Sequence, residues 1–561
     1  MPQPIPSPVQ VSTCDMQDKW WWDAVIYQIY PASFADSSGD GSGDLPGIIG
    51  RLDHLVRLGV DALWLSPFYV SPWVDHGYDV ADYRDVDPRF GTLADFDELV
   101  AAAHAAGIRV IIDIVANHTS SQHPWFRDAL AAGPGSPERA RYIFRDGKGP
   151  TGEERPNNWL ATRGNPAWTR TDDGQWYLHM FDTAQPDLNW RHPEVIAEFE
   201  SILRFWLDRG VDGFRVDVAS GMIKREGLPD WEFTPTVYFA DTSASPMWDQ
   251  DEVHEIFRGW HRVLAEYGAD RILVGEAHVG PFERLARYVR EDEMQQTFNF
   301  ALMSSPYEPK TIRARIDGPL AANAAVRATT TWVLSNHDAM RHVSRFGWAD
   351  FSARPRQMGP ADPRPDYALG LRRARALSQL MLALPGSAYL YQGEELGLPD
   401  NFDIPAHARQ DPAFFVNEGR IFGRDGCRVP LPWESDAPAF GFNNTGLTWL
   451  PQPQEWASLA VDRQEGVLDS TLELYKTAIR LRGAHALGSG DLRWVESSPQ
   501  ALVFDNRDIR VVMNFGPDPI VLDKGATVLL ASDSRAVKEG ELAADSTVWL
   551  SLDRLGEEDR R

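Results

Sequence analysis

The chain of 561 residues has only two cysteines, Cys14 and Cys427, and neither stands in a metal-binding spacing. This scarcity argues against a disulfide framework and suits a cytoplasmic protein in a reducing compartment. No run of about 18 apolar residues occurs, so we expect a soluble protein without a transmembrane helix. The N-terminus lacks the basic start and apolar stretch of a secretory signal, and we expect residues 1–18 to form a disordered tail.

Positive charge is also scarce, because 55 Lys and Arg residues stand against 81 Asp and Glu residues, a net charge of −26. Such a surface repels phosphate backbones and anionic lipid, so neither nucleic acid nor a membrane is expected as a partner. Aromatic residues are abundant, with 21 tryptophans. Their broad faces are useful for stacking on sugar rings, although large aromatic side chains more often fill a core.

Several segments repeat one pattern, an amphipathic stretch that ends at a glycine and is followed by a short β-branched run. In residues 192–210, Pro193 suits the first turn of a helix, apolar residues form one face, and Gly210 ends the helix. Helices that alternate with buried apolar strands indicate a parallel α/β sheet. The sheet could be open and doubly wound or closed into a barrel.

Polar residues at the strand ends favour the closed barrel. Alternation along residues 213–218 places Arg215 and Asp217 on one face, which points into the barrel, where a structural layer would be aliphatic. Because several strand ends converge on one site in a (β/α)8 TIM barrel, we predict this fold. The polar residues toward the C-terminal ends of different strands are Asn117, His118, Asp217, Glu276, His337 and Asp338.

The barrel, expected over residues 19–118 and 190–487, leaves three irregular regions to explain. Residues 119–189 are rich in Gly, Pro and Trp, and we expect them to form a small domain inserted after the third strand. Residues 221–253 are too long for an ordinary loop and should help to wall the site. Short alternating runs over residues 488–561 predict a C-terminal antiparallel β-sandwich without a catalytic role.

Two strand-end carboxylates, Asp217 and Glu276, are candidates for acid/base chemistry. Retaining hydrolysis of a glycosidic bond needs one carboxylate to attack the anomeric carbon and another to protonate the leaving oxygen. Each candidate follows an apolar strand, where burial and like charge can push two pKa values apart. From these residues alone, a structural pair of ion-paired acids is the alternative.

Five motifs in order resemble those of a known family. They are DIVANH (113–118), QPDLN (185–189), GFRVDV (213–218), VGEA (274–277) and SNHD (335–338). Together they resemble the α-amylase superfamily, glycoside hydrolase family 13, in its oligo-1,6-glucosidase and α-glucosidase branch. The resemblance covers nearly the whole chain, and RDGCRVPLPW resembles actinobacterial-type α-glucosidases. It implies a retaining, exo-acting α-glucosidase for short, maltose-like α-glucosides, with possible transglucosylation and no organic cofactor.

The resemblance also implies roles for individual residues. Asp217 would be the nucleophile, Glu276 the general acid/base, and Asp338 a third acid that binds sugar hydroxyls. His118 and His337 would donate hydrogen bonds to the sugar in the −1 subsite, which holds the glucose that is released.

Around this glucose, the resemblance implies a closed pocket. Asp75 and Tyr78 resemble residues that grip the outer hydroxyls and stack beneath the terminal glucose. Arg428 resembles an arginine that pairs with such an aspartate and closes the pocket, whereas Arg424 could belong to the same site or be a structural arginine. Arg215 would keep the nucleophile ionised, as a cation within a few ångströms should.

The loop DSSGDGSGD has the ligand spacing of a calcium loop. It resembles the small metal loop after the first barrel strand in this branch, with serine at a position where the family more often has asparagine. We expect one structural divalent cation, Ca²⁺ or Mg²⁺, and a solvated acidic turn is the alternative. Its ligands would be Asp36, Ser38, Asp40, the carbonyl of Ser42, and Asp44.

Some features leave the substrate open. His278 stands where relatives commonly have an aromatic residue, and Ala219 and Ser220 follow Val218. These positions border the +1 subsite, which holds the unit attached to the released glucose. The preferred glycosidic linkage, α-1,4 or α-1,6, therefore stays open. Rival functions are those of trehalose synthase, sucrose-directed hydrolases or phosphorylases, and transglucosidases. A catalytically dead, transporter-associated family member is least favoured, because the three acids are present and a membrane segment is absent. A monomer and a homodimer are both open.

Overall fold

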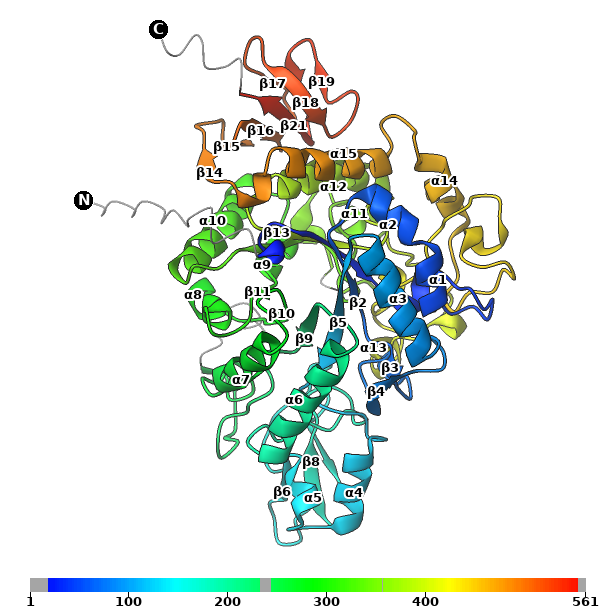
Figure 1. Ribbon diagram of the computed structural model, residues 1–561, viewed down its shortest axis with the longest axis vertical. Helices are drawn as coiled ribbons and strands as arrows, with labels where there is room; N and C mark the ends of the chain where they lie inside the picture. Colours follow the sequence, from blue (N-terminus) through cyan, green and yellow to red (C-terminus); the bar gives the residue numbers. More distant parts are fainter. Residues whose placement is uncertain (1–18, 233–243, 356, 553–561) are drawn as a thin grey trace, which may run out of the picture.

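The computed structural model describes residues 19–232, 244–355 and 357–552, and the tail predicted for residues 1–18 lies outside them. Its largest sheet has eight parallel strands: β1 (Val25–Ile29), β2 (Ala62–Leu65), β5 (Arg109–Val115), β9 (Gly213–Asp217), β10 (Ile272–Gly275), β11 (Gln296–Thr297), β12 (Thr331–Val333) and β13 (Ser387–Tyr391). The strand order is β11-β10-β9-β5-β2-β1-β13-β12. A parallel bridge between Phe298 and Thr331 joins the two end strands, so the predicted barrel is confirmed (Figure 1).

Helices cover the outside of this barrel (Figure 1). Those that follow successive barrel strands are α2 (Leu52–Leu58), α3 (Leu93–Ala105), α6 (Pro193–Leu207), α7 (Val253–Ala265), α8 (Phe282–Leu285), α10 (Pro309–Ala325), α12 (Tyr367–Leu382) and α15 (Thr471–Ala484). Shorter helices lie in the connections: α1 (Leu45–Gly50), α9 (Phe300–Met303), α11 (His342–Arg345), α13 (Pro412–Val416) and α14 (Val461–Gln464).

Helix α6 shows how the sequence sets these boundaries. The side chain of His192 accepts a hydrogen bond from the backbone N–H of Glu194, and Pro193 is the first helical residue. The helix ends at Leu207, and Gly210 then adopts a left-handed φ of 92°, which costs a glycine little. The chain thus turns directly into β9, whose last residue is Asp217.

Trp206 anchors α6 against its neighbours. Its side chain is fully buried and packs edge-to-face on Phe96 of α3, with ring centroids 4.8 Å apart, and on Phe68, 5.5 Å away. Its indole N–H donates a hydrogen bond to the carbonyl of Tyr83, 2.8 Å away. One side chain therefore ties α6 to α3 and to the connection that follows β2.

A small domain is inserted after β5, the third barrel strand, as predicted. It holds α4 (Pro124–Ala132), α5 (Pro137–Ala140) and an antiparallel sheet of β6 (Phe144–Asp146), β7 (Trp168–Arg170) and β8 (Gln175–Leu178). Its hydrophobic cluster includes Trp159, Trp168 and Met180, together with Leu228 and Met247 from the segment after β9. The inserted domain and that segment thus share one core, although residues 233–243 lie outside the described ranges.

In the connection after β2, strands β3 (Tyr69–Val70) and β4 (Asp82–Val86) pair with each other.

The C-terminal region forms two antiparallel sheets, as predicted. One holds β14 (Leu492–Trp494), β15 (Ala501–Asn506), β16 (Ile509–Asn514), β21 (Ser546–Ser551) and β18 (Thr527–Ala531), and the other holds β17 (Ile520–Val521), β20 (Glu541–Leu542) and β19 (Val537–Lys538). Val512 and Val548 of the first sheet share a hydrophobic cluster with Leu542 of the second. This sandwich docks on α12, where the Trp549 indole N–H donates to the carbonyl of Gln379, at the opposite end of the molecule from the inserted domain (Figure 1).

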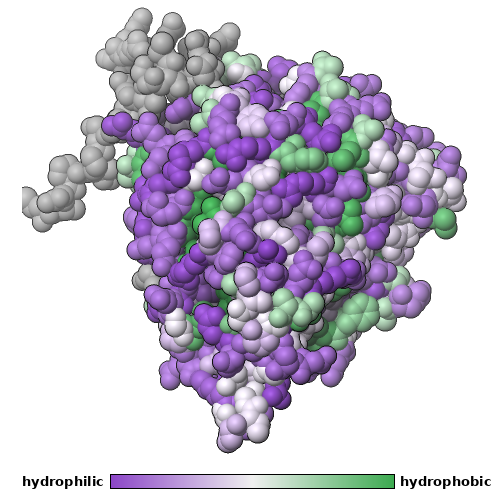
Figure 2. Space-filling view, turned by 60° about the horizontal axis from the view of Figure 1, so that its bottom comes forward, coloured by the Kyte–Doolittle hydropathy of each residue, from purple (hydrophilic) through white to green (hydrophobic). Residues whose placement is uncertain are grey.

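The surface agrees with the acidic composition. The face in Figure 2 is largely hydrophilic, and its apolar areas are separate from one another. Across the three described ranges, no helix is both long enough and apolar enough to cross a bilayer.

We predict that Trp206→Ala lowers the free energy of unfolding by about 3–5 kcal/mol, because it removes a fully buried indole and leaves a cavity between α3 and α6. Differential scanning calorimetry should show a lower melting temperature. Leu468→Ala is the control, since Leu468 is 92% exposed and its truncation should change little. Equal melting temperatures for the two variants would contradict this view of the α3–α6 contact.

Candidate active site

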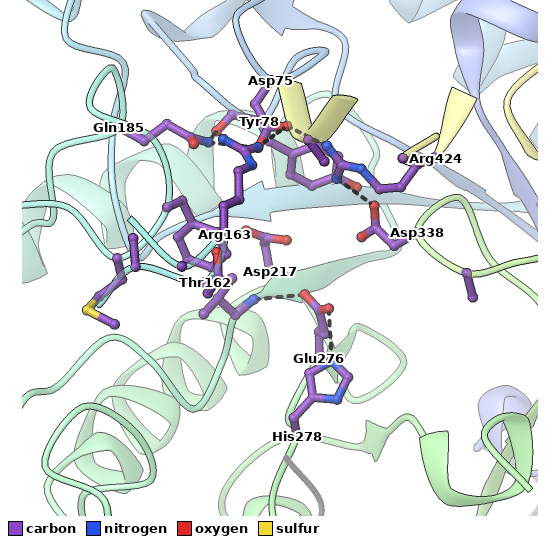
Figure 3. A pocket seen from close by; sticks show the side chains of 18 of the residues that line it. Asp75, Tyr78, Thr162, Arg163, Gln185, Asp217, Glu276, His278, Asp338 and Arg424 are labelled. Carbon is purple, nitrogen blue, oxygen red and sulfur yellow. Dashed lines mark hydrogen bonds and ion pairs between the residues drawn. The ribbon is translucent and has the colours of Figure 1, made fainter. Parts of the chain in front are cut away.

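A pocket of about 630 Å³ opens at the C-terminal end of the barrel and contains all three predicted catalytic acids. Asp217 is the last residue of β9, Glu276 directly follows β10, and Asp338 lies in the connection after β12. The C-terminal ends of parallel strands meet at one face of a barrel, which explains why these distant residues come together. In Figure 3, Asp217 lies between Glu276 and the group around Asp75.

The backbone after the nucleophile candidate is strained. Val218 has a φ of 47°, an unusual value for a β-branched residue. In this conformation its backbone N–H donates to Glu276 Oε2 at 3.1 Å, and the N–H of Ala219 donates to the carbonyl of Glu276 at 2.8 Å. The turn after β9 thus fixes the carboxylate that follows β10.

Arg215 joins three carboxylates. Its guanidinium lies 2.8 Å from Asp217 Oδ1, 2.6 Å from Glu276 Oε2 and 2.6 Å from Asp113 Oδ1. Arg215 is only 1% exposed, so these ion pairs are shielded from water. Arg215 therefore sets the positions of the two candidate catalytic acids and of Asp113 on β5.

The single charge of Arg215 cannot balance three buried carboxylates, and this imbalance shifts their pKa values. Burial raises the pKa of Asp217 well above its usual range, and Glu276 and Asp113 add to the effect although Arg215 opposes it. For Glu276, burial acts to raise the pKa, but Arg215 and His278 together lower the pKa below its usual range. Arg215 thus acts in the predicted direction on Asp217, favouring its ionised form, while burial and the two neighbouring carboxylates oppose it. Because Asp217 and Glu276 interact this closely, they titrate as a pair.

His278 is a direct neighbour of the acid/base candidate. Its Nε2 lies 3.6 Å from Glu276 Oε1, and its ring stacks on Phe300 with a centroid distance of 4.6 Å (Figure 3). The stacking fixes the ring, so the imidazole is held at one oxygen of Glu276 while Arg215 is held at the other.

The predicted pair between Asp75 and Arg428 is wrong. Asp75 Oδ1 instead pairs with Arg424, at 2.8 Å, and with Arg163 of the inserted domain, at 2.9 Å (Figure 3). Gln185 also donates to its other oxygen at 3.2 Å. Burial opposes ionisation, but the two arginines hold the pKa of Asp75 well below its usual range. Arg428 is fully buried, does not line the pocket, and donates to Asp338 and His337 instead.

Arg428 binds the third acid instead. Its Nη2 donates to Asp338 Oδ1 at 2.7 Å, and its Nε donates to the carbonyl of His337 at 2.8 Å. Arg424 also reaches Asp338 Oδ1, at 2.9 Å, and pairs with the buried Asp411 at 2.7 Å. Arg424 is thus the residue that joins Asp75 to Asp338 across the far end of the pocket.

The predicted sugar-binding residues divide into two groups. Tyr78 and His118 line the pocket, as does Gln185 of the QPDLN motif. His337 is fully buried, stacks on Tyr78 at 5.3 Å and contacts its hydroxyl at 2.6 Å, but it does not line the pocket. Burial lowers the pKa of His337 to about 3, so its ring is neutral. His337 therefore holds Tyr78 in place, and its Nε2 also lies 3.3 Å from Oδ2 of the pocket-lining Asp338. A direct contact between His337 and the sugar stays a prediction.

Sequence reasoning missed Arg163, Asp113 and Asp411. Asp113 lies within the quoted DIVANH motif, so its place beside the nucleophile could have been inferred from alternation along β5. Arg163 and Asp411 carry no such signal. Both lie in irregular segments whose path the sequence does not specify.

The predicted metal loop holds its shape through its own hydrogen bonds. Asp36 accepts backbone N–H groups of Gly39 and Gly41, and Asp44 caps α1 by accepting the N–H of Gly47. Among residues 19–232, 244–355 and 357–552, no three His, Cys, Asp or Glu side chains are grouped to hold a metal ion. The predicted ligands also include the Ser38 hydroxyl and the Ser42 carbonyl, which are not among these four side-chain types, so the ion stays a prediction.

Three comparisons with known proteins agree with this geometry. The family model "Alpha amylase, catalytic domain" matches residues 28–490. The chain is 38% identical over 508 residues to a probable alpha-glucosidase of Rhizobium meliloti (strain 1021), which covers 86% of both chains. It is 35% identical over 543 residues to an oligo-1,6-glucosidase of Parageobacillus thermoglucosidasius, which covers 89% of this chain and 91% of the relative. The alpha-glucosyl transfer enzyme XgtA has a similar crystal structure, with a TM-score of 0.83 at 34% identity over 95% of this chain and 99% of that one.

We predict that Arg424→Ala lowers kcat/KM by an amount equivalent to about 2–5 kcal/mol, because it leaves buried carboxylates without their shared cation. Steady-state kinetics on maltose would measure the loss. The control is Arg420→Ala in the same loop, whose side chain is 74% exposed. Similar values of kcat/KM for both variants would mean that the ion pairs of Arg424 with Asp75 and Asp338 do not contribute to catalysis.

We predict that His278→Phe moves the alkaline limb of the kcat/KM profile to higher pH. The phenyl ring keeps the stacking on Phe300 but removes the contact that lowers the pKa of Glu276. The pKa of Glu276 then rises, so the general acid stays protonated to higher pH. The pH dependence of kcat/KM tests this, with the exposed His407→Gln as control. An unchanged or downward-shifted limb would contradict the assigned contact.

Chelation tests the metal prediction. If the loop binds a divalent cation in solution, a chelator should lower the melting temperature more than the turnover number, because no residue of the loop lines the pocket. Readdition of Ca²⁺ or Mg²⁺ should restore the melting temperature. A melting temperature that ignores both treatments would identify the loop as a hydrogen-bonded turn.

Proposed function

The chain belongs to the α-amylase family of glycoside hydrolases, and we propose that it is a retaining, exo-acting α-glucosidase that releases glucose from short, maltose-like α-glucosides. The observation that carries the proposal is the arrangement of Asp217 and Glu276 around Arg215, in a pocket whose far end is closed by Asp75 and Arg424. Two inward-facing acids provide the chemistry, and the closed end limits the substrate.

The first step forms a glucosyl ester. An Asp217 oxygen attacks the anomeric carbon while Glu276 donates its proton to the glycosidic oxygen. The bond between the anomeric carbon and the glycosidic oxygen breaks. This step consumes a proton of Glu276, so Glu276 must be protonated when the substrate is bound. Arg215 contacts both acids and stabilises the carboxylate that attacks.

The second step releases the product. A water molecule attacks the anomeric carbon, its proton passes to the Glu276 carboxylate, and Asp217 leaves as a carboxylate. Two displacements at one carbon retain its configuration. Asp338, held by Arg424 and Arg428, lies where it can bind hydroxyls of the sugar ring.

Exo-action follows from the closed end of the pocket. Arg163 and Arg424 meet on one oxygen of Asp75, so a sugar beyond the terminal glucose would have to break buried ion pairs. A polymer can then react only at its non-reducing end. The wall formed by the inserted domain narrows the approach further, so efficiency should fall from disaccharide to starch.

Glucosyl transfer is a second activity of the same site. The similarity to the alpha-glucosyl transfer enzyme XgtA supports it, since an alcohol can replace water in the second step without any change in the protein. We place the enzyme in the cytoplasm, in line with its scarce cysteine.

We predict that Asp217→Asn abolishes turnover and that Glu276→Gln is rescued in part by substrates whose leaving group needs no protonation. Wild-type protein and both variants would be assayed on maltose and on p-nitrophenyl α-glucoside, with circular dichroism to verify folding. NMR of the first sugar released should show the α-anomer. A β-anomer would establish inversion and overturn the assigned roles.

The exo-mode has its own test. Wild-type enzyme should convert maltotriose into equal amounts of glucose and maltose at early times and should act on starch much more slowly than on maltose. Internal cleavage of starch, seen as a fast fall in viscosity with little glucose, would contradict the closed pocket.

A further inference from the structure

Asp75 lies on a turn whose backbone is strained. In Figure 3 its carboxylate lies where Arg163 and Arg424 meet, at the closed end of the pocket. Two residues of the turn have left-handed backbone angles, with a φ of 68° at Trp73 and of 52° at His76. Such angles are uncommon for bulky side chains and persist only where the surrounding structure fixes them. Contacts around Asp75 must therefore hold this turn in its shape.

The carboxylate of Asp79 supplies these contacts. Its Oδ1 accepts the backbone N–H of Asp75 and its Oδ2 accepts that of Val74, each at 2.9 Å. The hydroxyl of Ser71 donates to Oδ1 at 3.0 Å and itself accepts the backbone N–H of Trp73 at 2.9 Å. One carboxylate thus fixes the N–H groups of three successive residues, two directly and one through a serine.

The other side of the turn is joined to the arginine that holds Asp338. His76 Nδ1 lies 3.3 Å from a guanidinium nitrogen of Arg428, and the ring of Trp73 packs edge-to-face on the His76 ring at 5.6 Å. Burial lowers the pKa of His76 to about 3, so the neutral ring can accept a hydrogen bond from Arg428. The turn therefore lies between the two acids at the far end of the pocket, Asp75 and Asp338.

Asp79 can act on the sugar only through its neighbours. Its side chain is fully buried, and the described residues that line the pocket include Asp75 but not Asp79. Burial raises the pKa of Asp79 to about 6, and the nearby charge of Asp75 acts in the same direction, whereas the two backbone N–H groups oppose the rise. A carboxylate here is costly to bury, and its hydrogen bonds are all directed at the turn.

We propose that Asp79 is a positioning residue for recognition of the terminal glucose. It holds the strained turn so that the Asp75 carboxylate is fixed at the closed end of the pocket and binds a hydroxyl of the sugar. A carboxylate contributes fully to transition-state binding only when its position is set before the substrate arrives. The proposal rests on the proposed α-glucosidase function and adds a residue that acts behind the pocket.

A double-mutant cycle tests whether Asp79 acts through Asp75. Asp79→Asn preserves volume, but its amide NH₂ replaces one acceptor and faces a backbone N–H, so the turn relaxes. We expect kcat/KM for p-nitrophenyl α-glucoside to fall about tenfold or more. The same change made in Asp75→Asn should cost no more than about twofold. Equal losses in the two backgrounds would overturn the proposal.

Substrates that lack one hydroxyl distinguish positioning from a general loss of structure. The 2-, 3-, 4- and 6-deoxy forms of p-nitrophenyl α-glucoside would be assayed with wild-type enzyme and with both single variants. The hydroxyl bound by Asp75 is the one whose removal no longer lowers kcat/KM in Asp75→Asn. Asp79→Asn should lose most of its discrimination at this same hydroxyl and keep it at the other three. A uniform fall across the panel would overturn the proposal.

Two further variants control for folding. Asp212→Asn alters another buried carboxylate, one that accepts the backbone N–H of Val110 at 2.8 Å and does not line the pocket. It should lower the melting temperature and leave the deoxy profile of the wild type unchanged, and an equal change in this control would overturn the proposal. Ser71→Ala removes one hydrogen bond of Asp79 without removing a charge, so it serves if Asp79→Asn does not fold. It should alter the same hydroxyl to a smaller degree, and an unaltered profile would overturn the proposal.

The same assays separate this proposal from the function on which it rests. Wild-type enzyme that hydrolyses the parent glucoside and discriminates among the deoxy forms, with an unchanged profile in Asp79→Asn, would overturn the positioning role alone. Failure of the wild-type enzyme to release glucose from any α-glucoside would instead overturn the proposed function itself.

Discussion

The arrangement of the site depends on one guanidinium group held among three buried carboxylates. Arg215 points into the barrel from β9 and reaches Asp113, Asp217 and Glu276 on three neighbouring strands. The charge of Arg215 offsets part of the desolvation cost of these carboxylates, since acids this deeply buried would otherwise be neutral. Because one positive charge cannot balance three negative ones, burial raises the pKa of Asp217 and of Asp113 while Arg215 lowers both.

The closed end of the pocket also depends on shared ion pairs, but here one carboxylate is shared by two guanidinium groups. There two arginines from different parts of the chain share one oxygen of Asp75, and Arg424 also holds Asp338. Arg163 comes from the inserted domain, so this domain completes the site rather than only covering it. Charged groups therefore close this end of the pocket.

Much of the fold could be predicted because its signals are local. Residues 192–210 read as a helix that ends before a glycine, and α6 follows that outline. The polar residues Asp217 and Glu276 interrupt apolar strands, which identified the face of the barrel where the site lies. Arg428 was given the wrong partner, since two arginines four residues apart in a loop look equivalent until the loop is folded.

The sequence by itself determined the barrel, the order of its motifs and the acids at its strand ends, because strand alternation and helix periodicity act over a few residues. Only the tertiary structure decided which arginine meets Asp75, that Arg163 joins it, and that His337 lies behind Tyr78. These contacts join segments far apart in the chain. Their partners are selected by the packing of irregular loops, which has no sequence period to predict it.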